Sequence, residues 1–323
     1  MLPWRETMVD FKYLYQGICG IANAHPLGTM AGHLGAAVTA GYFIGEDQSE
    51  LPEEVSQGIE AELERVIAGE EAIWFDVKKT GITPTELFKP FPKGPPQPDL
   101  IKTIVVALQR NIGTLKQSGH NVIFASIAIR ALHGHNEYAT ASIVAGIRKL
   151  IERFKNVNPG RGYYGKDKGW LTGNQVTLVD DQRLPAYESI QQMIDVTIDE
   201  LILTGPIKKQ GFGGLWHLIN HAAAITELDR MQYHETAKLA LPAHHQHVEL
   251  LRTLPDVENE LGPVVKSQHD PLTAQYWAAD LNRDSAQLTH RIKTLFGYYT
   301  IRPFVESKAK QALADEAFLN LMQ

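Results

Sequence analysis

Three apolar segments, each beginning with a histidine, constrain the fold most, because none of them has a continuous polar face. They begin at His25, His120 and His217, and read HPLGTMAGHLGAAVTAGYF, HNVIFASIAIRALHGHNEYA and HLINHAAAITELDRMQYHETA. A helix that is apolar on every side has no face for water and is buried. These segments therefore predict an inner layer of buried helices, with amphipathic helices packed outside it.

The same order of elements recurs along the chain. The three histidines are separated by 95 and 97 residues, and each segment lies between an amphipathic helix and a more polar one. A period of this length built from helices is typical of stacked or circularly arranged layers. We expect an all-α fold in a single helical domain over 1–323, with a layered α/α repeat or toroid-like arrangement. Its repeats would cover 1–97, 98–186 and 187–270, followed by a C-terminal helical cap over 271–323.

Helical periodicity also appears outside the inner segments. Further helices are expected over 8–21, 53–68, 99–117, 139–154, 191–203, 236–253 and 273–296. Strand signals are few, and the plausible ones are 175–179 and short pieces near 72–77. Two long connections, 74–98 and 155–187, have a length that is typical of lids, binding loops or disordered segments. The second contains GRGYYG (160–165), which a helix precedes. We expect a flexible loop there, not a dinucleotide-binding turn.

Composition excludes several functions. The net charge of −6 argues against nucleic acid as a partner. The single cysteine, Cys19, allows neither an internal disulfide nor a cysteine-based zinc site. The most apolar stretch, 28–45, contains His33 and many small residues, so we expect a buried helix and no membrane association. Without a secretory signal at the start, a cytoplasmic location is expected. Whether the chain forms homo-oligomers is left open.

The strongest chemical signal is H-x-x-x-H at His217 and His221, within GGLWHLINHAAAI. This spacing places both imidazoles on one face of a helix, where they can ligate a divalent metal. A metal would need a further ligand, for which His25, His33 and His120 are candidates. The alternative is that each histidine is a core residue held by main-chain groups. A shared place in the repeat favours convergence on one pocket.

Three further histidines lie in PAHHQHVELL, on a helix that is polar overall. They are His244, His245 and His247, and we expect them at the surface. Chance binding of nickel or zinc there would need no dedicated site.

The two segments HNVIFASIAIRAL and GGLWHLINHAAAI resemble the questin oxidase-like family, whose members are helical proteins associated with NADPH-dependent Baeyer–Villiger oxidation. The matching positions are Gly213, His217, His221 and, more loosely, His120. Where the family has a second histidine four residues after His120, this chain has Phe124. The resemblance covers about a third of the chain, and it implies the fold more directly than the activity. NADPH as a cofactor rests on the resemblance alone, because no dinucleotide motif supports it.

Two hypotheses of different classes follow, and the sequence leaves open whether the chain is an enzyme. The first is an oxidoreductase-like enzyme with a histidine-lined pocket for an apolar small molecule. In that case His25, His120, His217 and His221 would be catalytic, with His217 and His221 as metal ligands or acid–base groups. The second is a non-catalytic helical-repeat scaffold that binds a protein or small ligand. The residues expected to bind substrate are His33, Tyr163, Tyr164, Trp170 and Trp216.

Overall fold

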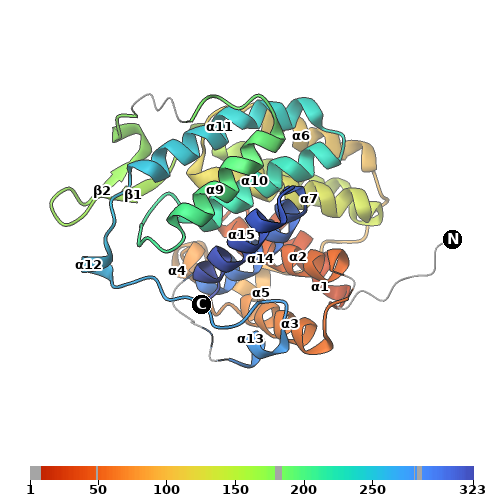
Figure 1. The fold of residues 1–323 in the computed structure, drawn as a ribbon. Coiled ribbons are helices and arrows are strands. Elements are labelled where there is room, and N and C mark those ends of the chain that lie inside the picture. Colours follow the sequence, from red (N-terminus) through yellow and green to blue (C-terminus); the bar gives the residue numbers. More distant parts are fainter. Residues whose placement is uncertain (1–8, 49, 179–183, 280, 282–285) are drawn as a thin grey trace. The chain divides into compact units, whose positions relative to one another are not determined.

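The computed structural model describes residues 9–48, 50–178, 184–279, 281 and 286–323 (Figure 1). Over these ranges the chain forms fifteen α-helices, short 3₁₀ turns and one antiparallel sheet of two strands. The predicted all-α class is therefore confirmed, while the repeat and its toroid-like arrangement stay predictions. Among the described residues, no helix is both long enough and apolar enough to cross a membrane.

The chain divides into two compact units. The first contains residues 1–101, 127–150 and 268–296, and the second contains 102–126, 151–267 and 297–323. Each unit therefore draws on segments that lie far apart in the sequence. The prediction of a single domain built from three repeats is not tested by this division.

The first unit is built around α2 (Gly32–Asp47), which contacts α1 (Lys12–Asn23) and α3 (Glu53–Ala68). Every residue of α2 from 32 to 45 is buried, as the absence of a polar face predicts. Helix α3 has two glutamates in its first turn and ends at Gly69, in the left-handed conformation. The other helices here are α4 (Val77–Thr80), α5 (Pro84–Leu87), most of α8 (Ala141–Glu152) and α13 (Ala274–Ala278).

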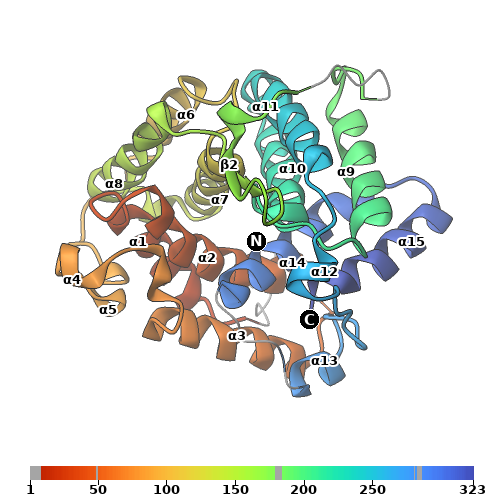
Figure 2. The same ribbon diagram turned by 90° about the vertical axis from the view of Figure 1, so that its left-hand side faces the viewer.

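The second unit packs α10 (Gly214–Arg230) against α9 (Ile190–Thr204) and α11 (His234–Thr253), as Figure 2 shows. Ser189 caps α9 by accepting a hydrogen bond from the backbone N–H of Gln192. α10 and α11 contribute to an apolar cluster, whose members are Leu115, Leu184, Phe212, Leu218, Val248, Leu250, Leu251 and Leu254. The other helices of the second unit are α6 (Ile101–Gln109), α12 (Glu258–Leu261) and α15 (Lys308–Phe318). The first residue of α6 belongs to the first unit.

Two helices run through both units. Helix α7 (His120–Gly134) begins in the second unit, and α14 (Gln287–Ile301) begins in the first. The helix predicted over 273–296 is thus wrong in its bounds, since α13 ends at Ala278 and α14 begins at Gln287. The helix predicted over 99–117 is too long, because α6 ends at Gln109 and a turn follows.

The strand predictions are wrong. Residues 173–175 form a 3₁₀ turn where a strand was expected from 175, and the last residue of that expected strand lies outside the described ranges. Residues 72–74 are also a 3₁₀ turn. The strands are instead β1 (Arg161–Tyr163) and β2 (Trp170–Thr172), so GRGYYG is not a flexible loop. Tyr163 pairs with Trp170 across the two strands, and aromatic pairs of this kind stabilise hairpins.

Candidate functional site

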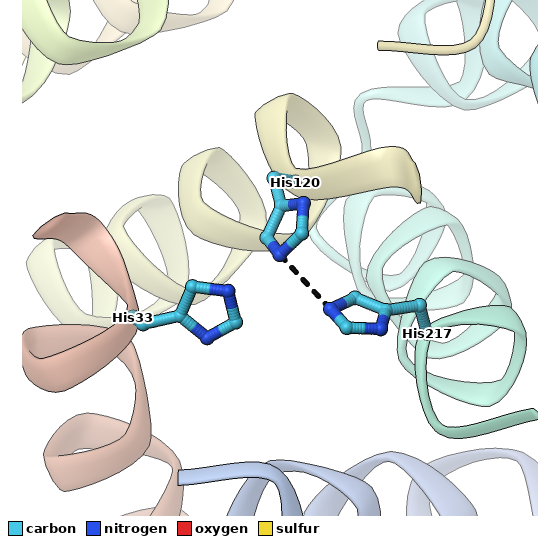
Figure 3. Close-up of side chains that lie close together, drawn as sticks. All are labelled: His33, His120 and His217. Atoms are coloured by element: carbon cyan, nitrogen blue, oxygen red, sulfur yellow. Dashed lines mark hydrogen bonds between the residues drawn. The ribbon is translucent and has the colours of Figure 1, made fainter. Parts of the chain in front are cut away.

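The second unit brings two of the predicted histidines into direct contact. His120 is the first residue of α7, and His217 lies in the first turn of α10. Their Nε2 atoms are 2.9 Å apart, and both side chains are buried, with 3% and 5% exposure (Figure 3). His33, also drawn in Figure 3, belongs to the first unit.

Main-chain carbonyls fix the other nitrogen of each ring. His120 Nδ1 is hydrogen-bonded to Gln117 O, and His217 Nδ1 to Gly213 O at 2.9 Å. A carbonyl oxygen can only accept, so each Nδ1 carries the hydrogen. In a neutral imidazole the Nε2 atom then carries a lone pair and no hydrogen. Two Nε2 atoms that each carry a lone pair in the neutral ring thus lie 2.9 Å apart, and a shared proton or a bound metal ion would relieve the repulsion between the lone pairs.

A run of left-handed backbone precedes each of these histidines. Gln117, Ser118 and Gly119 all have positive φ, and so do the four residues 211–214, the last of which is the first residue of α10. The first run is held by Gln117 N–H donating to Asn158 O and Ser118 N–H donating to Pro159 O, both at 2.8 Å. Non-glycine residues in this region store strain, which is concentrated at functional sites. The backbone conformation that positions both rings therefore lowers the stability of the folded protein.

Gly213 shows how closely the backbone fits the ring. Its φ is 72°, and a Cβ added there would lie 1.9 Å from His217 Nδ1. A side chain at this position would displace the imidazole and weaken its bond to the Gly213 carbonyl. The glycine in GGLWHLINH is therefore part of the site and not merely a helix start.

His221 lies one turn after His217, and its ring is wholly buried. Among the described residues, neither of its ring nitrogens has a hydrogen-bond partner. Burial, and then the neighbouring histidines, hold the pKa of His221 well below its ordinary value. Its ring packs against Gly119, where an added Cβ would lie 2.7 Å from the ring. His221 is thus neutral at physiological pH and adjoins the residue before His120.

His244 and His247 of α11 adjoin His221, with ring centroids 5.2 and 5.8 Å from it. Both are completely buried, so the prediction of a surface position is wrong for them. His244 bonds Thr197 Oγ1 and Tyr187 Oη, each at 3.3 Å, while His247 Nε2 donates to Phe212 O at 2.8 Å. Burial lowers the pKa of His244 to about 3 and that of His247 to about 4. His245 is partly buried and bonds Leu184 O.

In the first unit, His33 and Lys293 form a buried pair. Lys293 Nζ is hydrogen-bonded to His33 Nδ1, and the His33 ring stacks on Trp74 at a centroid distance of 3.9 Å. Burial lowers the pKa of Lys293 to about 7, while the nearby charge of Glu71 opposes this shift. The Glu71 carboxylate accepts hydrogen bonds from the N–H groups of Leu288 and Thr289 at the start of α14.

His25 does not begin a helix, contrary to the sequence prediction. It lies in the turn between α1 and α2, where its Nδ1 is hydrogen-bonded to Ala22 O at 3.1 Å. The residue of this segment that occupies a first helical turn is His33, the second residue of α2. Pro26 and Gly28 follow His25 and delay the helix, since proline disfavours helical backbone in the residue before it.

The aromatic residues predicted to bind substrate have structural partners. The hydroxyl of Tyr163 donates to Glu260 at 2.7 Å, and that of Tyr164 bonds Thr253 Oγ1 at 2.6 Å. Trp216 donates through Nε1 to Leu321 O at 3.1 Å. Trp170 is 49% exposed and packs against Tyr163. These contacts attach the hairpin to α11 and α12, and a role in binding substrate stays a prediction.

Sequence reasoning missed four buried polar residues and one half-buried tryptophan in the two units. The buried residues are Glu71, Lys293, His244 and His247, and the tryptophan is Trp74. The two α11 histidines could have been found, because AHHQH puts His244 and His247 three apart on a helix that also carries buried leucines. Lys293 had no comparable signal within its own amphipathic segment.

Comparison with protein-family models, curated proteins and solved structures finds no match to this chain. The resemblance to the questin oxidase-like family therefore stays a prediction.

Proposed function

We propose that this chain is an enzyme whose His120 and His217 bind a divalent transition metal through their Nε2 atoms. The observation that carries the proposal is the 2.9 Å approach of two Nε2 atoms whose Nδ1–H groups are both held by carbonyls. Metal-binding histidines usually donate their other N–H to a carbonyl or carboxylate, which fixes the tautomer. Each ring here has that arrangement. A shared proton between the two rings is the competing account, and the metal content of the protein distinguishes the two.

The separation of the two nitrogens favours one kind of metal. If an ion lay about 2.1 Å from each nitrogen, the N–metal–N angle at this separation would be roughly 90°. That is the angle between neighbouring positions of an octahedral ion, whereas a tetrahedral ion needs nitrogens about 3.4 Å apart. Iron, nickel or copper would accept imidazole ligands at right angles. A redox-active ion of this kind would suit the oxidoreductase-like activity.

Two protein ligands would leave coordination positions open, which is typical of catalytic and not of structural metal sites. A bound redox metal supplies Lewis acidity and one-electron exchange. The protein's part would be to hold both rings rigidly and to exclude water. His221, neutral and buried one helical turn after His217, would act as a hydrogen-bonding group beside them, because burial lowers its pKa and makes it a weak base. Because the helices that carry these residues are buried and apolar, we propose an apolar small molecule as substrate.

The alternative is the non-catalytic helical-repeat scaffold. In a scaffold, each buried histidine would be hydrogen-bonded to main-chain groups alone, and the histidines would not lie together. The bond between His120 and His217, together with the unbonded nitrogens of His221, supports the enzyme instead. The repeat itself, a cytoplasmic location and homo-oligomers stay predictions.

The test is the metal content of untagged protein, measured by plasma mass spectrometry after reconstitution with iron(II), copper(II) or zinc(II). We expect close to one equivalent of iron or copper in the wild type, and loss of the metal in His120→Ala and His217→Ala. His234→Ala is the matched control, because that side chain is 51% exposed on α11. It should retain the metal.

Each other result has a definite meaning. Binding of zinc alone would contradict the oxidoreductase-like activity and leave a metalloenzyme. No metal in any sample, with circular dichroism showing folded protein, would overturn the metal site and favour the scaffold.

A further inference from the structure

A hollow of about 440 Å³ lies in the second unit, bordered by the turn before α7, the segment 155–159, Asn174 and α11. Its charged lining residues are Lys116 and Lys155, and none of the described residues that line it is acidic. We call it the lysine hollow, defined by Lys116, Lys155, Asn158 and Gln246. Its volume suits a small molecule, since ligand pockets are typically about 300–1,000 Å³.

Two lining amides are oriented by bonds to the backbone. Gln246 Oε1 accepts from Leu115 N–H at 3.0 Å, and Asn158 Oδ1 accepts from Gly160 N–H at 2.8 Å. Each bond fixes which way the amide points, so the NH₂ group lies on the side away from that backbone N–H and can donate to a ligand. The lysine hollow thus offers two ammonium groups and two oriented amide donors.

We propose that the lysine hollow binds a small molecule that carries an oxyanion group, a phosphate or a carboxylate. A ligand with only hydrogen-bond acceptors matches a lining of N–H donors, and charge-assisted bonds of this kind are stronger than neutral ones. Lys155 is exposed and Lys116 half-buried, so the site is open to solvent and the positive charges would attract anions from it. The chain as a whole has a net charge of −6, so the positive charge of the lysine hollow is opposite in sign to that of the whole protein.

The lysine hollow adjoins the turn that positions His120. Lys116 lines the hollow, and the next residue, Gln117, holds His120 Nδ1 through its carbonyl. Asn158 and Pro159, which also line it, accept the backbone hydrogen bonds of Gln117 and Ser118. An anion seated there would contact the same turn. The binding site itself is independent of whether a metal is bound.

The experiment is isothermal titration calorimetry of metal-free protein with pyrophosphate and, separately, with citrate, at low and high salt. We expect saturable 1:1 binding of at least one anion, weakened by salt. The better ligand assigns the site to phosphate or to carboxylate. Using metal-free protein separates this test from the proposed metal centre.

Gln246→Glu is the decisive variant, because its carboxylate can still accept from Leu115 N–H while it replaces the NH₂ donor with a negative charge. We expect at least a 10-fold weaker affinity in it and in the double variant Lys116→Met with Lys155→Met. The exposed Lys168 of the hairpin provides the control, and Lys168→Met should bind as the wild type does. The proposal is overturned if neither anion binds saturably, or if Gln246→Glu binds as tightly as the wild type.

Discussion

Acid should destabilise this protein through the buried histidines of α10 and α11. His221, His244 and His247 are fully buried and neutral, and burial lowers the pKa of each. In the unfolded chain a histidine has a pKa near 6.5. Between pH 6.5 and about 4 the unfolded state therefore binds more protons than the folded state. The free energy of unfolding must fall as the pH falls through this range.

The magnitude follows from the two pKa values. For a histidine whose folded pKa is about 3 or 4, lowering the pH from 7 to 5 costs about 2 kcal/mol. His244 and His247 together should thus remove about 4 kcal/mol of stability over that interval. His221 acts in the same direction. A loss of this size is a large part of the total stability of an ordinary domain.

Urea unfolding at pH 7 and pH 5 measures this loss, and His247→Gln isolates one contribution. Glutamine can keep the N–H donor to Phe212 O but cannot titrate. The difference in unfolding free energy between the two pH values should be about 2 kcal/mol smaller in this variant. His234→Gln, at an exposed site, should leave the difference unchanged. If His247→Gln and the wild type lose the same amount, the assignment of the acid sensitivity to buried histidines is refuted.

Three further predictions test other parts of the structure. Gly213→Ala should lower the metal content, because the added Cβ would displace the His217 ring. At Gly214 an added Cβ meets nothing within 4 Å, so Gly214→Ala should keep the metal. Its cost should be backbone strain of about 1 kcal/mol. Burial lowers the pKa of Lys293 to about 7 in the folded protein, so above pH 7 the unfolded chain binds more protons at this residue than the folded protein does. The free energy of unfolding therefore rises as the pH rises above 7. The wild type should be about 2 kcal/mol more stable to urea at pH 9 than at pH 7, and Lys293→Met should lose that difference. Ser189→Ala, which removes the cap of α9, should cost about 1 kcal/mol in thermal unfolding.

Periodicity predicted the helical class because it reports burial directly. The segment after His33 has no polar face, and all of α2 from 32 to 45 is buried. The same reasoning failed for the two β-strands, whose order depends on a pairing between Tyr163 and Trp170 across a turn. A three-residue strand has too few residues to show a period.

His120 and His217 were both predicted to lie in one pocket, but the sequence did not show which of their atoms meet. H-x-x-x-H identified His217, but its Nε2 contact is His120, 97 residues away, and His221 points to a different set of neighbours. The start of α2 was misplaced because His25 begins the segment, whereas the helix begins after the turn at Gly28. Contacts between residues distant in sequence have no local pattern, so Lys293 and His33 could not be paired from the sequence alone.

The central claim is that His120 and His217 hold a metal through Nε2. X-ray absorption at the metal edge of reconstituted, untagged protein tests it most directly, with His217→Gln measured beside it. The account predicts two imidazole nitrogens at about 2.1 Å in the wild type and one fewer, or no bound metal, in the variant. A metal environment without imidazole, or one that is identical in His217→Gln, would contradict it.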